Sequence, residues 1–235
     1  MEKFVEQLTR AVIAAYGGES LWRGAKTVNA TISSGGLAFL AKFHQGARRL
    51  RVEVDPMRPR TKLYLGLEGL VGLLEGGNVR IENSSGQELA ARADARRLFP
   101  GGRRWLWWDK LDQLYFTGYA LWNYLAFPAL LLRDDIVWTA VSSSVLEAIF
   151  PPGLPTHSGS QRFHFEPSTG LLRQHDYTAE VFGNWAKAAH VILEHRTWNG
   201  IPFAARRRVT LRRPDGAPLP WPVLVWIEVH DWSIS

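Results

Sequence analysis

The chain of 235 residues carries a formal net charge of +6, with 46% hydrophobic and 21% charged residues. This length and composition are typical of one soluble globular domain that buries a sizeable core. The chain contains no cysteine, which excludes disulfides, thiolate metal sites and a cysteine nucleophile.

The first residues predict a helix over residues 3–16. Apolar side chains recur there with helical spacing, and a glycine pair supplies the C-terminal stop. The residues concerned are Phe4, Val5, Leu8, Val12 and Ala15, followed by Gly17 and Gly18. Glu2 and Glu6 stand where a secretory signal has basic residues, so we expect a mature start and a cytoplasmic location.

Short alternating runs from Lys26 to Asn83 predict an antiparallel meander. The expected strands are KTVNATIS, GLAFLAKF, RRLRVEVD, TKLYLGL, LVGLLE and NVRIEN. In the third run Leu50, Val52 and Val54 alternate with charged residues, which is typical of a strand with one buried face.

Residues 86–133 interrupt the meander with helix-forming composition. GQELAARADARRLF comes first, and residues 113–132, QLYFTGYALWNYLAFPALLL, follow without a formal charge. These twenty residues have the length of a membrane span, but Pro128 should end or kink the helix near Phe127 and leave about 15 helical residues from Lys110. We therefore expect a buried helix and no transmembrane span.

A strand at DDIVWTAV and a second meander are predicted after this insertion. Its strands cover residues 160–166, 171–181, 188–197, 203–213 and 222–231. Pairing across the EPSTG turn should place Phe163 near Arg173 and Gln161 near His175. The expected inner face comprises Phe163, Phe165, Leu171, His175, Tyr177, Phe203, Ala205, Val209, Leu211, Val223, Val225, Ile227 and Val229. Asp176 should point to the opposite face.

This element order predicts a single α+β domain over residues 1–235. We expect a strongly curved antiparallel sheet, an incomplete β-barrel, of about 10–11 strands, because so many strands do not stay flat and open easily. The N-terminal helix and the helical insertion over about 86–133 should fill or cover its concave face.

Three stretches resemble a known superfamily. The opening AYGGESLWRGAKTVNATISSGG is similar to the start of bacterial lipoprotein carriers of the LolA and LolB type, where an N-terminal helix ends at a Gly pair. The hairpin FHFEPSTGLLRQHDY and the later WNGIPFAARRRVTLRRPDG are similar to its paired strands and its Gly-Ile-Pro strand entry. The resemblance implies an incomplete β-barrel with a hydrophobic cavity, closed by helices, that holds an acyl chain or another apolar ligand.

Diagnostic catalytic and nucleotide-binding motifs are absent from the sequence, so candidate chemistry rests on single residues. If His175 and Tyr177 face the cavity, they could orient a carbonyl or hydroxyl or shuttle a proton, and His157 is a further candidate acid or base. Convergence of His157, His175 and His195 on a metal is an alternative, and purely structural histidines are another. We expect neither a metal nor a cofactor.

Aromatic residues are concentrated in the insertion and predict a ligand-lining surface. The candidate ligand-binding residues are Trp107, Trp108, Tyr115, Phe116, Tyr119, Trp122, Phe163 and Phe165. The favoured hypothesis is a binder of an acyl, isoprenoid or polyketide-like molecule. The alternative is a cofactor-independent cyclase, isomerase or lyase in the same cavity. A third interpretation is peripheral contact between basic faces and anionic lipid, and we expect no nucleic-acid binding.

Overall fold

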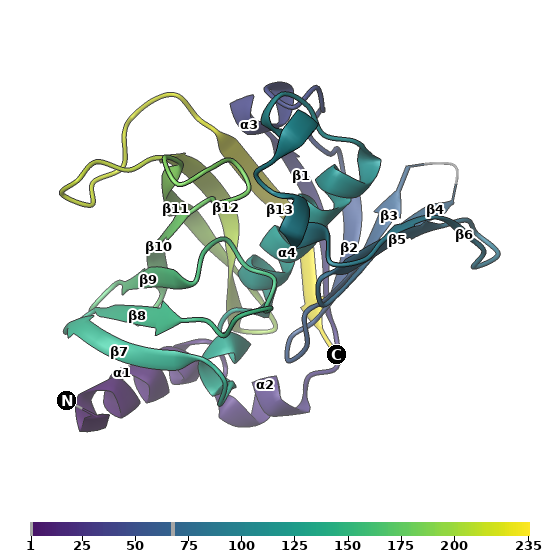
Figure 1. Ribbon diagram of the computed structural model, residues 1–235. Coiled ribbons are helices and arrows are strands. Elements are labelled where there is room, and N and C mark those ends of the chain that lie inside the picture. Colours follow the sequence, from purple (N-terminus) through teal and green to yellow (C-terminus); the bar gives the residue numbers. More distant parts are fainter. Residues whose placement is uncertain (1, 67–68) are drawn as a thin grey trace.

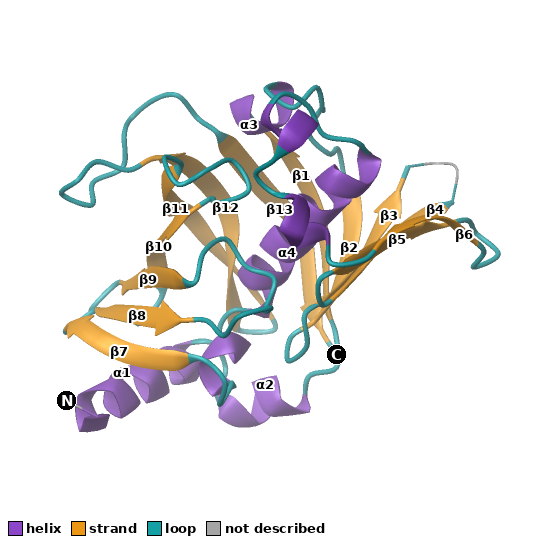
Figure 2. Ribbon diagram, viewed as in Figure 1, coloured by secondary structure: helices purple, strands orange, loops and turns teal. Residues whose placement is uncertain are grey.

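One antiparallel sheet of thirteen strands curves around the helix α4 (Lys110–Ala126) in the computed structural model, which describes residues 2–66 and 69–235 (Figures 1 and 2). The other helices are α1 (Glu2–Ala15), α2 (Glu19–Gly24), α3 (Leu37–Leu40) and the short 3-10 helices η1 (Ala95–Leu98), η2 (Gly102–Trp105) and η3 (Ala129–Leu132). The first six strands are β1 (Val28–Gly35), β2 (Leu50–Asp55), β3 (Arg60–Leu65), β4 (Leu70–Glu75), β5 (Asn78–Glu82) and β6 (Glu88–Arg92). The others are β7 (Val137–Ser142), β8 (Val145–Ile149), β9 (Ser160–Phe165), β10 (Leu172–Thr178), β11 (Lys187–Trp198), β12 (Ile201–Leu211) and β13 (Val225–Ile234).

Two meanders meet in the middle of the sheet. The strand order runs from β6 back to β1, then from β13 back to β7, and β1 pairs with β13 through partners such as Val28 and Ile234. The chain between β6 and β7 carries α4 across the concave face (Figure 1). In the described residues the edge strands β6 and β7 are not neighbours in the sheet. The predicted curved sheet, an incomplete barrel around a helix, is confirmed.

The observed helices and strands differ from the predicted ones in four places. GLAFLAKF was expected as a strand, but residues 37–40 form α3, which is tied to another segment by hydrogen bonds from Leu37 N to Val223 O and Ala38 N to Leu224 O. GQELAARADARRLF was expected as a helix, but β6 extends the first meander by pairing with β5, and only η1 is helical. Helix α2 and strand β8 were not predicted. The total is therefore thirteen strands instead of about 10–11.

Register in the β9–β10 hairpin also differs from the expectation. Phe163 pairs with His175, not with Arg173, and an irregularity lies between Leu172 and Gln174. Because the slip is two residues, the predicted faces of Phe163 and His175 are kept. The irregularity shifts the inward position from Leu171 to Leu172, which is buried.

Charged groups anchor the first turn of α4. Asp109 and Asp112 form a reciprocal capping box, in which each carboxylate accepts the backbone N–H of the other residue. The fully buried Asp112 carboxylate also pairs with Arg92 at 2.6 Å, Arg103 at 2.7 Å and Arg104 at 2.8 Å. Burial raises the pKa of Asp109, but Arg92, the Asp112 backbone N–H and Arg103 together lower it below its ordinary value. Ionised carboxylates at this N-terminal end suit the helix dipole.

A glycine lets α4 approach the sheet closely. A Cβ at Gly118 would lie 3.0 Å from the Cβ of Leu74 on β4, and the Thr61 hydroxyl on β3 donates to the Gly118 carbonyl at 2.9 Å. The helix ends at Ala126, two residues before Pro128, as predicted. In the described part of the chain, no helix combines the length and the apolar character needed to cross a bilayer.

Candidate ligand-binding cavity

A cavity of about 330 Å³ lies between α4 and the concave face of the sheet. From α4 it is lined by Phe116, Ala120 and Tyr124, which share one helix face at intervals of four residues. From the sheet it is lined by Ile32 on β1, Tyr177 on β10, Ala188 on β11, Val209 on β12 and Ile227 on β13. Ala120 and Ala188 contribute only small side chains, and apolar side chains form most of the wall.

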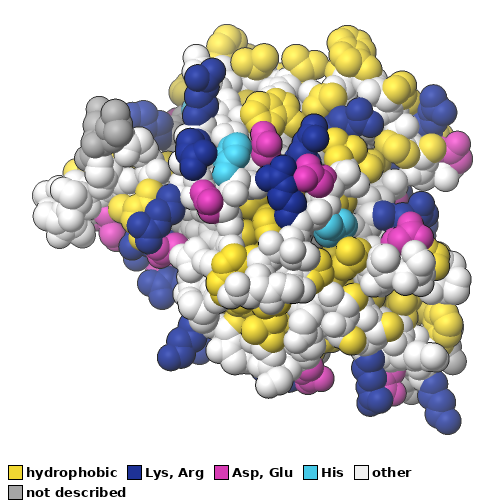
Figure 3. Space-filling model, turned by 180° about the vertical axis from the view of Figure 1, so that it is seen from behind, with side chains coloured by type: hydrophobic (Ala, Val, Ile, Leu, Met, Phe, Trp, Pro, Cys, Tyr) yellow, Lys and Arg dark blue, Asp and Glu magenta, His cyan; other side chains and the backbone are white. Residues whose placement is uncertain are grey.

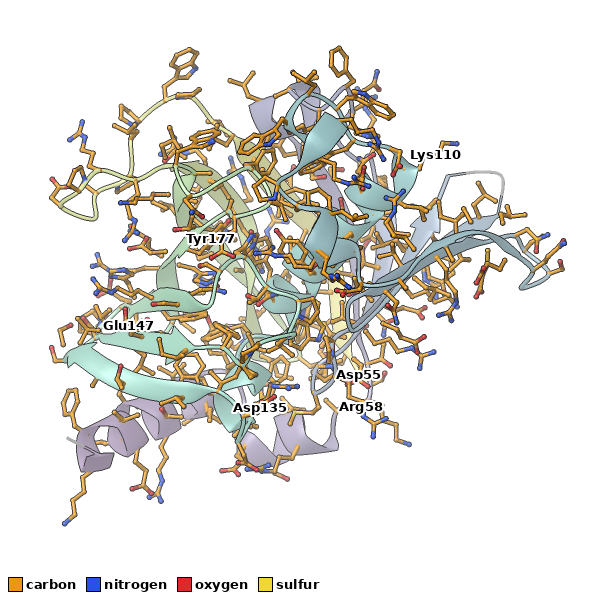
Figure 4. The ribbon with its side chains drawn as sticks, in the orientation of Figure 1. Asp55, Arg58, Lys110, Asp135, Glu147 and Tyr177 are labelled. Carbon is orange, nitrogen blue, oxygen red and sulfur yellow. The ribbon has the colours of Figure 1, made fainter. Side chains whose placement is uncertain are left out.

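A chain of hydrogen bonds forms one polar end of this cavity. The Tyr124 hydroxyl lies 2.7 Å from the Tyr177 hydroxyl and 2.8 Å from Nε2 of His157. On the far side of the imidazole, Nδ1 lies 3.4 Å from the Tyr119 hydroxyl. Tyr177 lies on the side of β10 that faces α4 (Figure 4). Three of these groups, Tyr124, His157 and Tyr177, contribute to the cavity wall.

Burial keeps this polar end uncharged at neutral pH. Desolvation lowers the pKa of His157 well below its ordinary range, and nearby His175 lowers it further. Desolvation also raises the pKa of Tyr124 and of Tyr177 above the usual phenol range. A neutral imidazole and two neutral phenols can donate and accept hydrogen bonds, so they suit an uncharged hydroxyl or carbonyl.

The three predicted catalytic residues lie close together, but only two reach the cavity. The imidazole of His157 stacks on the ring of Tyr177, with 3.8 Å between centroids. His175 lies behind them, with Nε2 2.6 Å from Oε1 of Gln161, and burial lowers its pKa to about 3. Asp176 faces the other side of the sheet, where Oδ2 lies 2.9 Å from Nε2 of His164. His175, Asp176 and Tyr177 therefore do not act as one triad.

The predicted aromatic ligand residues divide into several groups. Phe116 lines the cavity, and Trp108 packs behind it, with 5.2 Å between ring centroids. Tyr119 does not line the cavity but contacts His157, which does, whereas Tyr115 stacks on Phe99.

The remaining predicted ligand residues lie away from the cavity. Phe163 and Phe165 stack on Phe127, and the Trp122 indole donates to the Asp55 carbonyl at 2.8 Å. Trp107 is 44% exposed.

Tyr124, which lines the cavity, and Arg207, which contacts the Tyr124 carbonyl, were not among the predicted site residues. Tyr124 could have been found from its position eight residues after Phe116 on the same helix face. Arg207 has the same strand parity as Ala205 and Val209, so its side chain also faces inward and is buried. Its Nη1 lies 3.5 Å from the Tyr124 carbonyl, and Nε and Nη2 each lie 3.2 Å from the Ala204 carbonyl.

The Arg207 guanidinium is a buried cation beside the C-terminal end of α4. Desolvation lowers its pKa to about 10, so the group stays protonated at neutral pH. Carbonyl oxygens at the end of a helix carry partial negative charge, which partly offsets the cost of burying this cation. Acids at one end of α4 and Arg207 at the other therefore match the polarity of the helix.

The alternative of a metal bound by His157, His175 and His195 is not supported by the described residues. No group of three or more His, Asp or Glu side chains there could hold a metal ion. His195 lies with Nε2 3.4 Å from the Tyr16 hydroxyl, apart from the polar end of the cavity.

A larger hollow of about 940 Å³ lies between the start of α4 and the first meander. It is bordered by Arg48, Arg49 and Lys110, and its more polar, open wall makes it a less selective place for an apolar molecule. Ser34, Phe39 and Thr117 contribute to both hollows. We therefore take the smaller cavity as the candidate site.

No protein-family model and no curated protein matches the sequence. Solved structures do match. A LolA superfamily protein from Nitrosomonas europaea shares 12% identity at a TM-score of 0.51, with 100% of this chain and 93% of that chain covered. A DUF1329 family protein from Desulfovibrio piger shares 10% identity at 0.46, covering 98% and 92% of the two chains. A putative outer membrane lipoprotein-sorting protein domain from Vibrio parahaemolyticus shares 8% identity at 0.46, covering 97% and 91%. The predicted resemblance to LolA-type proteins is therefore confirmed at the level of the fold.

Proposed function

We propose that the protein binds an apolar small molecule that carries one uncharged polar group. The apolar part would occupy the cavity between α4 and the sheet, and the polar group would meet the Tyr177 hydroxyl. The observation that carries this proposal is a cavity with a mostly apolar wall, at one end of which Tyr124, His157 and Tyr177 form a neutral hydrogen-bonded group. The one charged side chain of the wall, Lys42, donates to the Arg104 and Trp105 carbonyls. The LolA-type fold supports it, because the resemblance implies an acyl chain or another apolar ligand.

Tyr177 is the terminal member of the hydrogen-bond chain and has capacity left for a ligand. If Tyr177 donates to Tyr124, its lone pairs can accept a bond from a ligand hydroxyl. If the chain runs in the opposite direction, the Tyr177 hydroxyl hydrogen can donate to a ligand carbonyl. Both directions fit an alcohol, and the second also fits a ketone or ester. A carboxylate is less suitable at this end because its neighbours Tyr124, His157 and Tyr177 are neutral and would not offset the cost of burying the charge.

The surroundings of His157 and Tyr177 do not favour the enzymatic alternative. In the described part of the chain, the side-chain hydrogen bonds of His157 and Tyr177 go to neutral tyrosines, with no carboxylate to orient the imidazole. A general base usually has such an orienting group.

A cavity-filling variant tests the site. Ala120→Leu adds volume on the α4 face of the cavity, and we expect its affinity for a fluorescent long-chain fatty alcohol to fall at least about tenfold, a loss of about 1.4 kcal/mol. Ala93→Leu, at an exposed position, is the matched control and should bind like the wild type. Thermal unfolding of both variants checks that they fold. Equal affinity of Ala120→Leu and the wild type would exclude this cavity as the site.

The polar end is tested separately with Tyr177→Phe. This variant should bind a fatty alcohol roughly fivefold more weakly, because one hydrogen bond contributes about 1 kcal/mol, and it should bind the alkane of equal length unchanged. Native mass spectrometry and solvent extraction of the purified protein would identify the class of any ligand that copurifies. If Tyr177→Phe weakens both probes equally, the hydroxyl does not recognise the polar group.

A further inference from the structure

We infer that the mouth of the cavity is a docking surface for an anionic lipid membrane. The inference concerns a set of exposed apolar residues, called here the mouth patch: Leu40, Phe43, Trp105, Leu106, Trp185 and Trp221. Of these, Phe43 is 81% exposed, Trp221 75% and Leu106 71%. Large apolar side chains with such exposure cost free energy in water, so a group of them marks an interaction site.

Four separate segments bring these side chains together. Residues 37–43 are tied to residues 221–224 by the hydrogen bonds from Leu37 and Ala38 to Val223 and Leu224. The buried Lys42 ammonium donates to the Arg104 carbonyl at 2.8 Å and to the Trp105 carbonyl at 2.7 Å, which joins residues 37–43 to η2.

The fourth segment lies beside η2. A Cβ at Gly183 would lie 3.0 Å from the Trp185 indole and 3.3 Å from that of Trp105, so these two rings are neighbours. Figure 3 shows hydrophobic side chains gathered along the upper edge of the molecule, near which Figure 1 places α3.

The mouth patch borders the cavity on its exposed side, because Trp105 and Trp185 belong to both. Leu37, Trp105, Trp185 and Leu224, one from each segment, contribute to the cavity wall, and three of them are also among the exposed large hydrophobic residues. An apolar molecule leaving the cavity at this place would meet Trp105 and Trp185 first. Docking on a lipid layer would let such a molecule pass between bilayer and protein without crossing water.

The charges of the same segments favour an anionic lipid surface. Residues 37–48, 97–107, 181–187 and 217–224 contain six basic residues and neither Asp nor Glu. The six are Lys42, Arg48, Arg97, Arg103, Arg104 and Lys187. Arg97, Arg103 and Arg104 pair with acids on either side of residues 97–107, which are Asp94, Asp109 and Asp112, and Lys42 is buried. The attraction therefore rests mainly on Arg48 and Lys187, which are exposed. Basic side chains beside a membrane are attracted by the negative potential of anionic lipids.

The tryptophans and the basic charge of the mouth patch favour a lipid surface over a second copy of the chain. Trp105, Trp185 and Trp221 have an apolar ring and a polar N–H, which suits the boundary between headgroups and acyl chains. A second copy would bring the same basic segments face to face, and like charges oppose that association. We therefore assign the mouth patch to lipid.

Vesicle cosedimentation tests this assignment. The double variant Phe43→Asn/Leu106→Ala removes two highly exposed side chains that do not line the cavity, and Asn tolerates the positive φ of 61° at residue 43. We expect wild-type protein to sediment with phosphatidylcholine vesicles that contain phosphatidylglycerol, and less with phosphatidylcholine alone or at high salt. The double variant should partition roughly tenfold more weakly, because each exposed apolar side chain contributes to burial in the interface. The matched control, Val137→Ala/Leu193→Ala, removes exposed apolar groups elsewhere and should sediment like the wild type.

Two results would overturn the inference. One is wild-type protein that stays in solution with anionic vesicles, and the other is a double variant that sediments as well as the wild type. Light scattering that reveals a dimer abolished by Phe43→Asn/Leu106→Ala, without vesicle binding, would assign the patch to a second copy instead. The inference is independent of the proposed ligand: Ala120→Leu should bind vesicles normally even though its cavity is filled, so the two proposals can fail separately.

Discussion

Replacing His190 should make the protein more resistant to acid. His190 on β11 is 1% exposed, and both of its ring nitrogens lack a hydrogen-bond partner among the described residues. Desolvation lowers its pKa well below the ordinary range, and Arg207 and His175 lower it further. In the folded protein the imidazole is therefore neutral, whereas in the unfolded chain it takes up a proton near pH 6.5.

The sign of the pH dependence follows from this difference. As the pH falls below about 6.5, the unfolded state binds the proton before the folded state does, so the free energy of unfolding decreases. At pH 5, about 1.5 units below the ordinary histidine pKa, the cost of keeping His190 neutral is about 2 kcal/mol. His157 and His175 are buried in the same way, so the three together should cost about 6 kcal/mol at pH 5, comparable with the whole stability of many domains.

His190→Leu removes one of the three side chains that take up a proton only when the chain unfolds. At pH 8 the variant should match the wild type within about 1 kcal/mol, because an apolar side chain of similar size replaces polar atoms that make no hydrogen bond. At pH 5 it should be more stable than the wild type by about 2 kcal/mol beyond any difference at pH 8. Urea unfolding at a series of pH values measures the slope for each protein. Parallel curves from pH 8 to pH 5 would refute the reasoning, since they would mean that His190 takes up its proton without a cost in the fold.

Two further changes test how α4 is held. Asp112→Asn keeps an acceptor for the capping box but removes the buried charge that three arginines contact, so we expect a loss of about 3 kcal/mol in urea unfolding. The control is Asp135→Asn, because Asp135 is a half-exposed carboxylate paired with Arg133. Its loss should change the free energy of unfolding by less than about 1 kcal/mol. Equal effects of the two variants would contradict the role of Asp112. Gly118→Val should cost about 2 kcal/mol or more through overpacking against Leu74, and a stability unchanged in thermal unfolding would show that α4 can move away from the sheet at no cost.

Local pattern in the sequence was sufficient for most strands and for both ends of the two main helices. Alternation predicted all of the first five strands and all five from β9 to β13, because a strand with one buried face needs an apolar residue at every second position. Gly17 with Gly18 and Pro128 correctly marked the ends of α1 and α4, because positive φ and a missing N–H act on the backbone locally. The resemblance in three short stretches was sufficient for the fold, which the structural comparison confirms.

Tertiary contacts decided what local pattern left open. Residues 88–92 have helix-forming composition, yet they become β6 because β5 offers a free edge for pairing. The cavity depends on Ala120 and Tyr124 of α4 and on Ala188 of β11, which is distant from them in sequence and meets them only because α4 crosses the sheet. The same crossing places Arg207 beneath the carbonyl end of α4 and Asp112 among three arginines. A period of two or of 3.6 residues specifies which side of an element is apolar, whereas the partner that this side meets is set by packing across the whole chain.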